Sequence, residues 1–143
     1  MKLLPAILIC LSLASCAQVM ASDLETVYQT IAMESANQPV AGQIAVASVI
    51  IERSKRSGKA LEAVCKAPRQ FSCWNSPKEA KRWLRTYYTP KVRGEAVRAV
   101  KIAFLKPSKT KFTHYHAIGC YPRWARGHKG VRIGDHLFYR GIR

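Results

Sequence analysis

The feature that most constrains the fold is an apolar segment in the first half of the chain. Val40 to Ser54 contains the run Gln-Ile-Ala-Val-Ala-Ser-Val-Ile-Ile, which places apolar side chains on almost every side of a helix. A helix that is apolar all round is stable only when it is buried. We therefore expect a central helix with other elements packed around it, ended by a charged run and Gly58.

The rest of the chain predicts a single α+β domain that is mainly helical. Asp23 is placed to cap one helix, and Ser76 with Pro77 begins another. The last third alternates and is rich in Thr, Tyr, Phe, His and Val, which indicates a small C-terminal β-sheet. Helices are expected at 23–36, 40–54, 60–64, 77–87 and 92–105, with a loop at 66–75 and strands at 111–118 and 131–139.

The first 22 residues have the pattern of an export signal. Lys2 gives a short positive start, and residues 3–14 are apolar but too few to span a bilayer comfortably. Two processing routes fit: cleavage before Ser22, or lipidation of Cys16 in the lipobox-like Leu-Ala-Ser-Cys. We expect a signal peptide at 1–22, a folded domain at 23–143, and a location in the periplasm or cell envelope, with a lipoprotein as one of the two forms.

The charge of the chain predicts an anionic partner. It has 24 Lys and Arg against eight Asp and Glu, a net charge of +16. So large an excess favours a polyanion. An exported protein rarely meets nucleic acid, so we expect no nucleic-acid partner and instead the anionic polymers of a bacterial envelope, including peptidoglycan with its peptide carboxylates. We expect a monomer without a cofactor, in contact with a membrane only through its signal or a lipid anchor.

Three cysteines follow the signal segment, as is common in an oxidising compartment. Cys65 and Cys73 are close in sequence around a loop, so a disulfide between them is expected. Cys120 is an alternative partner for either one. No CxxC spacing is present, which argues against a redox motif or a zinc ribbon.

Glu34 is the strongest candidate for acid–base chemistry. It follows an apolar helical face, and burial disfavours the charged form of a carboxyl group, so that it can hold a proton near neutral pH. Such an acid can protonate a leaving oxygen. Asp135, in a turn or at a strand edge, is the alternative candidate for a second carboxylate that acts with Glu34. Surface pairing with nearby Lys or Arg accounts for Glu52, Glu62, Glu79 and Glu95.

Other segments combine aromatic rings with hydrogen-bonding groups, as sugar-binding clefts do. The cleft candidates are Gln70, Phe71, Ser72, Tyr115, His116, Trp124 and Tyr139. Core packing is the alternative explanation for the aromatic ones. The histidines and Asp135 are residue types that bind zinc, but no HExxH motif is present, so we expect no metal site.

The chain resembles the SleB-type cell wall hydrolases, the family of spore-cortex-lytic enzymes. Family members show a Glu-Ala-Arg-Gly-Glu-Pro-like segment and then Gly-Gln-x-Ala-Val-Ala-x-Val-x-x-Asn-Arg. Here these read as residues 34–39, Glu-Ser-Ala-Asn-Gln-Pro, and residues 42–53, Gly-Gln-Ile-Ala-Val-Ala-Ser-Val-Ile-Ile-Glu-Arg. Three further matches follow in order: Gln-Phe-Ser at 70–72, Tyr-His-Ala with Pro-x-Trp-Ala at 115–117 and 122–125, and Ile-Gly-Asp-His-Leu-Phe-Tyr at 133–139.

The resemblance implies a lysozyme-like fold and cleavage of the peptidoglycan glycan between N-acetylmuramic acid and N-acetylglucosamine. It assigns the catalytic acid to Glu34, and several family members are similar to lytic transglycosylases. Two departures, Gln38 for the second Glu and Glu52 for Asn, put a second acid in doubt. One carboxylate suffices for a transglycosylase, whereas most glycosidases need two, so we expect a lytic transglycosylase in which Glu34 acts first as acid and then as base. A wall-binding protein without activity and a zinc-dependent amidase or peptidase stay as alternatives.

Overall fold

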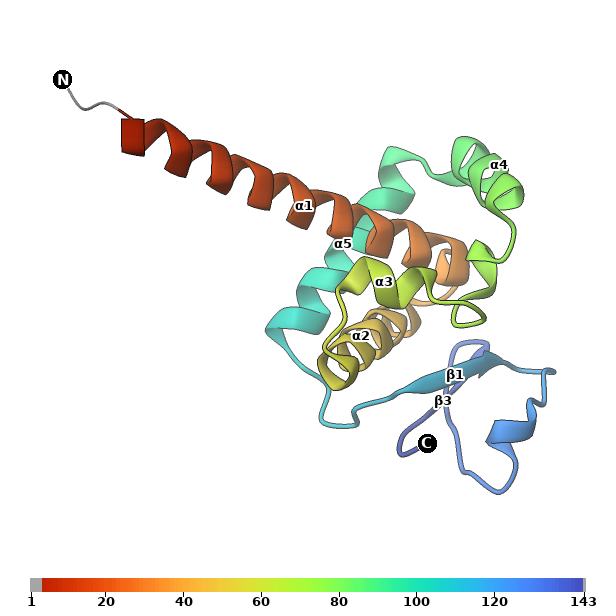
Figure 1. The fold of residues 1–143 in the computed structure, drawn as a ribbon. Helices are drawn as coiled ribbons and strands as arrows, with labels where there is room; N and C mark the ends of the chain where they lie inside the picture. The colour runs from red at the N-terminus through yellow and green to blue at the C-terminus, as the bar shows by residue number, and fades with distance from the viewer. Residues whose placement is uncertain (1–3, 143) are drawn as a thin grey trace.

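The computed structural model describes residues 4–142, with side chains from Met20 onward. The predictions for the signal segment and for Cys16 fall largely outside the described side chains. Figure 1 shows helices grouped around α2, with a small sheet beside them. In chain order the elements are α1 (Leu4–Ser35), α2 (Val40–Ser57), α3 (Leu61–Lys66), η1 (Ser72–Trp74), α4 (Pro77–Tyr87), α5 (Pro90–Leu105), β1 (His114–Ala117), η2 (Arg123–Ala125), β2 (Val131–Ile133) and β3 (His136–Tyr139).

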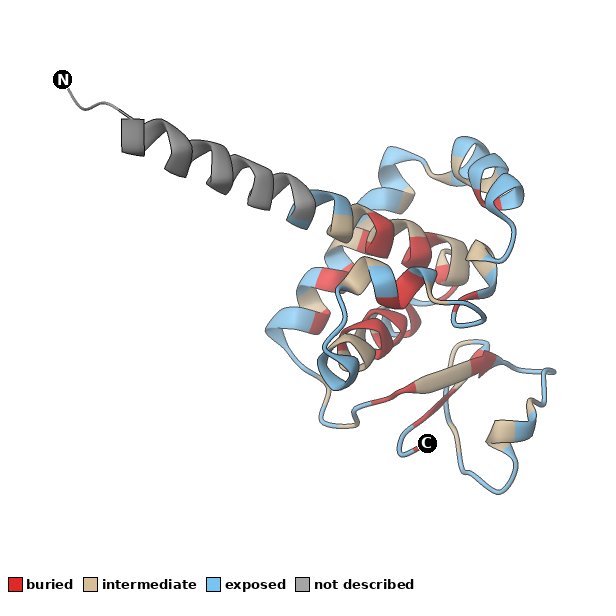
Figure 2. Ribbon diagram, viewed as in Figure 1, coloured by how far each residue is buried: buried red, intermediate tan, exposed pale blue. Residues whose placement is uncertain are grey.

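The α+β prediction is confirmed, and α2 is the central helix that the apolar run predicted. It packs against α1, α3 and α5. Val46, Ala47, Val49 and Ile50 have no exposed surface at all. Figure 2 shows the buried residues gathered where these helices face one another. Gly58 ends α2 with a positive φ of 67°, which a residue with a side chain adopts less readily.

Local capping chemistry decided where the later helices begin. The Ser76 hydroxyl accepts a hydrogen bond from the Glu79 N–H at 3.4 Å, so α4 has the predicted bounds. Helix α5 begins two residues earlier than predicted. The Thr89 hydroxyl accepts from the Val92 N–H at 3.3 Å, and the fixed φ of Pro90 suits the first helical turn.

The prediction that Asp23 caps α1 is wrong. Helix α1 continues through this residue. The Asp23 carboxylate instead accepts a hydrogen bond from the backbone N–H of Glu62, in the first turn of α3. A first-turn N–H has no partner within its own helix, so a carboxylate from the neighbouring helix α1 satisfies it.

The sheet is antiparallel in the order β1-β3-β2. The strand predicted over 131–139 is two strands, because Gly134 turns the chain with a φ of 60°. The N–H of Asp135, in the same turn, donates to the Gln38 side-chain oxygen at 2.8 Å. This bond ties the sheet to the junction of α1 and α2, next to Glu34.

The predicted disulfide between Cys65 and Cys73 is not formed, and Cys120 is also a free thiol. Cys65 is buried in α3, whereas Cys73 is only half-buried in η1. Closeness in sequence therefore did not lead to a bond between the two sulfur atoms.

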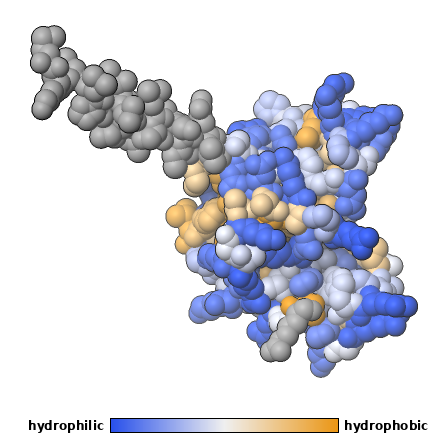
Figure 3. Space-filling model, in the orientation of Figure 1, coloured by the Kyte–Doolittle hydropathy of each residue, from blue (hydrophilic) through white to orange (hydrophobic). Residues whose placement is uncertain are grey.

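Hydrophilic side chains cover most of the face seen in Figure 3, with an apolar patch near the end of α5, where Phe104 and Leu105 are exposed. Among the described residues, no helix combines the length and the apolar character that crossing a membrane requires.

Candidate active site

Glu34 lies in the last turn of α1, at the point where the chain leaves the helix. The helix ends because the chain turns through residues 36–38 ahead of Pro39, with the Gln38 N–H donating to the Ser35 carbonyl at 2.9 Å. The Glu34 side chain is half-buried. A carboxylate at a helix C-terminus faces unpaired carbonyl groups, so its position has to be stabilised by donors from other elements.

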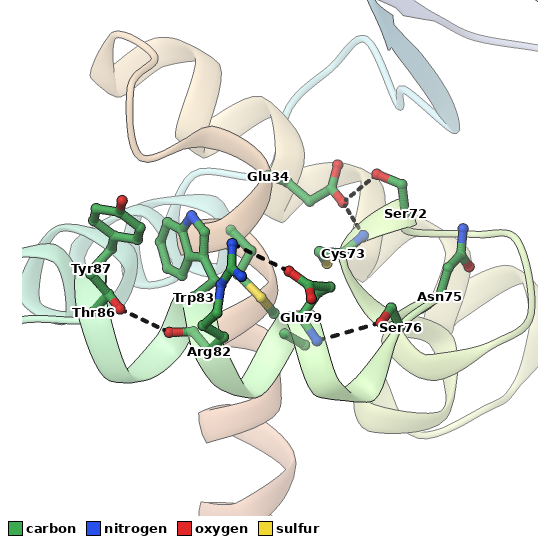
Figure 4. Close-up of a pocket in the computed structure, with 12 residues that line it drawn as sticks. Glu34, Ser72, Cys73, Asn75, Ser76, Glu79, Arg82, Trp83, Thr86 and Tyr87 are labelled. Atoms are coloured by element: carbon green, nitrogen blue, oxygen red, sulfur yellow. Dashed lines mark hydrogen bonds and ion pairs between the residues drawn. The ribbon is translucent and has the colours of Figure 1, made fainter.

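Three donors from two distant segments hold the Glu34 carboxylate. The Tyr115 hydroxyl, on β1, donates to Oε2 at 2.8 Å. Both contacts to Oε1 come from η1 and are longer: the Cys73 N–H at 3.2 Å and the Ser72 hydroxyl at 3.4 Å. Figure 4 shows Ser72 and Cys73 beside this carboxylate. The side chain is therefore fixed by the tertiary structure and not by its own helix.

The groups around Glu34 stay uncharged. Burial, followed by the nearby Glu34 charge, raises the pKa of Tyr115 well above its usual value. The same two causes raise the pKa of the Cys73 thiol. Both side chains therefore keep their protons at neutral pH, and the Tyr115 hydroxyl can donate to the carboxylate.

Glu34 opens onto a pocket of about 580 Å³ between the end of α1, η1 and α4. Helix α4 contributes two aromatic rings, Trp83 and Tyr87, whose centroids are 5.5 Å apart (Figure 4). The lining residues are Met33, Glu34, Ser72, Cys73, Asn75, Ser76, Glu79, Ala80, Arg82, Trp83, Thr86 and Tyr87.

Most of the α4 wall was missed from the sequence. Trp83 and Tyr87 are four residues apart, so they lie on one face of a helix, and Tyr87 is 57% exposed. An aromatic pair on a helix that is otherwise rich in Lys and Arg was the available signal, because a core face would be more aliphatic.

A second carboxylate, Glu79, lines the same pocket. It pairs with Arg82 at 3.6 Å, as its sequence neighbourhood predicted, and both side chains are largely exposed. Asp135 is not among the residues that line this pocket. It is exposed in the turn between β2 and β3, where its backbone bonds to Gln38.

The predicted cleft residues separate into different environments. Ser72 and Tyr115 contact Glu34 directly. Phe71 is only 1% exposed, so its ring belongs to the core and cannot form a cleft wall. Gln70 is exposed and lines a different pocket, on the other side of Phe71.

Three other cleft candidates form an aromatic cluster beside the sheet. His116 and Tyr139 are buried, stacked with centroids 5.4 Å apart, and joined by a 2.8 Å hydrogen bond. The half-buried Trp124 packs edge-on against both rings. The structure corrects the prediction for His116 and Tyr139, since their polar atoms satisfy each other instead of facing a ligand.

The histidines are also dispersed. The Nδ1 atom of His116 contacts the Ala117 carbonyl at 2.8 Å, and His114 packs against Trp124. Within the described residues, no three His, Cys, Asp or Glu side chains come together as metal ligands. The site therefore consists of an oriented carboxylate, neutral donors and an aromatic wall, an arrangement that suits proton transfer to a bound ligand.

Two solved structures have a similar fold. The catalytic domain of the SleB protein from Bacillus cereus is 20% identical, with a TM-score of 0.61, covering 82% of this chain and 89% of that one. The catalytic domain of the germination-specific lytic transglycosylase SleB from Bacillus anthracis is also 20% identical, with a TM-score of 0.62, covering 82% and 93%. No curated protein matches the chain.

The match to a family model shows which family the chain belongs to, whereas the similar structures show only the fold. Residues 37–139 match the Cell Wall Hydrolase family model, which is more than half of the chain. The match agrees with the SleB-type motifs in the sequence, although it begins three residues after Glu34. The chain therefore belongs to the Cell Wall Hydrolase family, the SleB-type enzymes that act on peptidoglycan.

Proposed function

We propose that this protein cleaves the glycan strand of peptidoglycan between N-acetylmuramic acid and N-acetylglucosamine as a lytic transglycosylase, with Glu34 as the catalytic residue. The observation that carries the proposal is the anchoring of Glu34. A carboxylate held by Tyr115, Ser72 and Cys73 at the edge of a large pocket is placed to exchange a proton with a bound glycan.

The two oxygen atoms of Glu34 have different tasks in this proposal. Oε2 accepts the short bond from Tyr115, which does not line the pocket. Oε1 lies on the side of Ser72 and Cys73, which do line it, and its contacts are longer and weaker. Oε1 is therefore the oxygen that carries the transferable proton, while Tyr115 fixes the orientation of the group.

The reaction needs one carboxyl group used twice. Protonated Glu34 donates its proton to the glycosidic oxygen as the bond from C1 of the muramic residue to that oxygen breaks. The glucosamine fragment leaves with a new hydroxyl group. The Glu34 carboxylate then takes the proton of the muramic 6-hydroxyl as O6 bonds to C1, which closes a 1,6-anhydro ring and restores the acid. No water is consumed, so no second carboxylate is needed to activate one.

The α4 wall is suited to holding the sugar. The Trp83 and Tyr87 rings offer apolar faces to a sugar ring, and Asn75, Ser76 and Arg82 supply hydrogen-bonding groups along the same pocket (Figure 4). Mixed apolar and polar linings of this kind fix both the position and the orientation of a ligand.

We also propose that the protein is exported and retained in the envelope by its charge. The net charge of +16, which becomes +15 when Lys2 is removed with the signal segment, would hold it on an anionic wall. Retention on isolated walls should then weaken steeply as salt is raised, since screening shortens the range of these interactions. Retention that does not change with salt would contradict this mechanism.

The test is digestion of purified peptidoglycan in H₂¹⁸O, with the products analysed by mass spectrometry. We expect 1,6-anhydro products without ¹⁸O, and Glu34→Gln should lower the rate about 10²- to 10⁴-fold, as expected for loss of a general acid–base. Glu95→Gln is the matched control, because Glu95 lies on α5 and does not line this pocket. It should retain the wild-type rate.

Other outcomes point to the alternatives. Reducing ends that carry ¹⁸O would show hydrolysis, and the Glu79→Gln variant would then test that residue as the second carboxylate. Wild-type protein that binds walls but releases no fragments would support a binding function alone. Peptide cleavage that EDTA abolishes would support the zinc amidase.

A further inference from the structure

A second pocket lies on the other side of the segment that contacts Glu34. Its volume is about 300 Å³. Gln70 lines this pocket while Ser72 lines the Glu34 pocket, and the buried Phe71 separates the two. The lining residues are Arg53, Arg56, Ser57, Lys59, Val64, Ala67, Gln70, Thr113, His114 and Ile142.

The lining residues come mainly from the C-terminal end of α2, the segment 64–70 and the start of β1. The Arg53 guanidinium joins α2 to the start of β1, because its Nε–H donates to the Thr113 carbonyl at 2.7 Å. The same guanidinium lies 5.2 Å from the centre of the Phe71 ring. Arg53 is thus held in a fixed orientation at the wall that divides this pocket from the catalytic one.

Among the residues that the structure describes, the positive charge of the pocket is only partly neutralised. No carboxylate lines it, and in the described part of the chain only Arg56 has an ion-pair partner there, Glu52 at 2.7 Å. The Nη1 atom of Arg53 is buried and has no acceptor among the described residues. Burial, and then the charges of Arg53 and Arg56, lower the pKa of His114, which indicates a positive potential inside the pocket.

We propose that this pocket binds a carboxylate of the peptide stem of peptidoglycan, an inference that rests on the proposed function. Guanidinium groups match the geometry of a carboxylate, and the exposed Arg56 and Lys59 line the pocket together with Arg53. Each stem is attached to a muramic residue, so it leaves the glycan beside the bond that is cut. A stem carboxylate bound in this pocket would fix which muramic residue occupies the catalytic position.

Binding is tested without catalysis, by following the His114 ring in NMR titrations of the Glu34→Gln protein. The probes are a synthetic L-Ala–D-Glu–diaminopimelate peptide, the same peptide with its carboxyl groups amidated, and inorganic phosphate. We expect the acidic peptide alone to give saturable shifts and to raise the pKa of His114, because a bound anion stabilises the imidazolium. Equal binding of the amidated peptide, binding of phosphate only, or no binding would overturn the proposal.

The charge-matched variants are Arg56→Gln/Lys59→Gln in the pocket and Arg98→Gln/Lys101→Gln on the exposed face of α5. The double substitution in the pocket (the pocket pair) should weaken binding of the acidic peptide about tenfold, as expected for the loss of charge-assisted contacts. The double substitution on α5 (the α5 pair) should leave binding unchanged. Equal weakening by both would show a general charge effect and refute the site. If the pocket pair lowers the melting temperature, Lys59→Gln alone repeats the test, since Lys59 is exposed and its removal breaks no ion pair among the described residues.

Kinetics then separate this inference from the proposed function. On intact peptidoglycan the pocket pair should raise KM with little change in kcat, and on glycan strands stripped of their peptides it should match the wild type. A pocket pair that is equally impaired on stripped strands refutes stem recognition while Glu34 catalysis stands. Peptide binding by a protein that cuts no glycan would refute the proposed function and leave the binding site.

Discussion

Removing the Tyr115 hydroxyl tests the geometry of the site most directly. Tyr115→Phe deletes one oxygen atom and leaves the ring packed against Phe138 and His136, at centroid distances of 5.3 and 5.2 Å. The deleted bond is the short one to Glu34, at 2.8 Å. The substitution therefore changes the orientation of the carboxylate with little change in packing.

The magnitude follows from the type of bond. A hydrogen bond to a charged group contributes about 1.5–3 kcal/mol. The Tyr115–Glu34 bond acts by holding Oε1 toward the substrate in the transition state. Since each factor of ten in rate corresponds to about 1.4 kcal/mol, loss of this bond should lower kcat about 10- to 150-fold. KM should change little, because Tyr115 does not line the pocket.

Tyr88→Phe is the matched control. Its hydroxyl also donates to a carboxylate at 2.8 Å, but to Glu25, whose other partner is Arg93. The control loses the same kind of bond without affecting Glu34, so kcat should stay within about twofold of the wild type while the melting temperature falls slightly.

The assay is initial-rate release of anhydro fragments from peptidoglycan, with melting temperatures measured in parallel. A Tyr115→Phe enzyme with kcat within about twofold of the wild type would refute the role of Tyr115 in orienting Glu34. An equal loss of kcat in Tyr88→Phe would show that the rate follows general stability and not the site geometry.

Three further predictions concern the pocket wall, the turn beside Glu34 and the acid stability of the fold. Trp83→Ala should raise KM for glycan about tenfold while leaving kcat nearly unchanged, since it removes an aromatic face from the α4 wall; steady-state kinetics test this, and a wild-type KM would contradict the sugar platform. Gly134→Ala should lower the free energy of unfolding by about 2 kcal/mol, because φ is 60° and the new Cβ would lie 2.5 Å from the Gln38 Oε1 atom; urea denaturation measures it, and unchanged stability would refute the close approach. Burial acts to raise the pKa of Glu25, but hydrogen bonds from Arg93 and Tyr88 outweigh it and hold the pKa below its usual 4.5. The charged Glu25 side chain therefore stabilises the fold above about pH 4.5, and this stabilisation is lost as the pH falls further. The urea midpoints of the wild type and Glu25→Gln should converge in acid, and a difference that stays constant with pH would contradict this reasoning.

The helices were predictable because their signals are local. Ser76 and Pro77 begin α4 as predicted, and the apolar run from Val40 made α2 the central helix. Errors arose where a residue serves another element. Asp23 satisfies α3 instead of beginning α1, and this depends on how two helices pack, which no local pattern records.

The catalytic candidate was also accessible from the sequence, but its surroundings were only partly so. Glu34 was identifiable as a scarce carboxylate after an apolar face, and Ser72 and Tyr115 lie in matching motifs. Phe71, His116 and Tyr139 carry the same aromatic signal yet are buried, because a ring that faces the core and a ring that faces a ligand look alike in sequence. The α4 wall carried no motif at all.

The sequence by itself determined the mainly helical class, the central position of α2 and the family, and it pointed to Glu34 as the candidate for acid–base chemistry, since each of these depends on composition or on short-range order. Only the tertiary structure decided what holds that residue. The donors to Glu34 are 38, 39 and 81 positions away along the chain. Contacts of this separation form only when η1 and β1 pack against the end of α1, and the same packing places the basic pocket on the far side of Phe71.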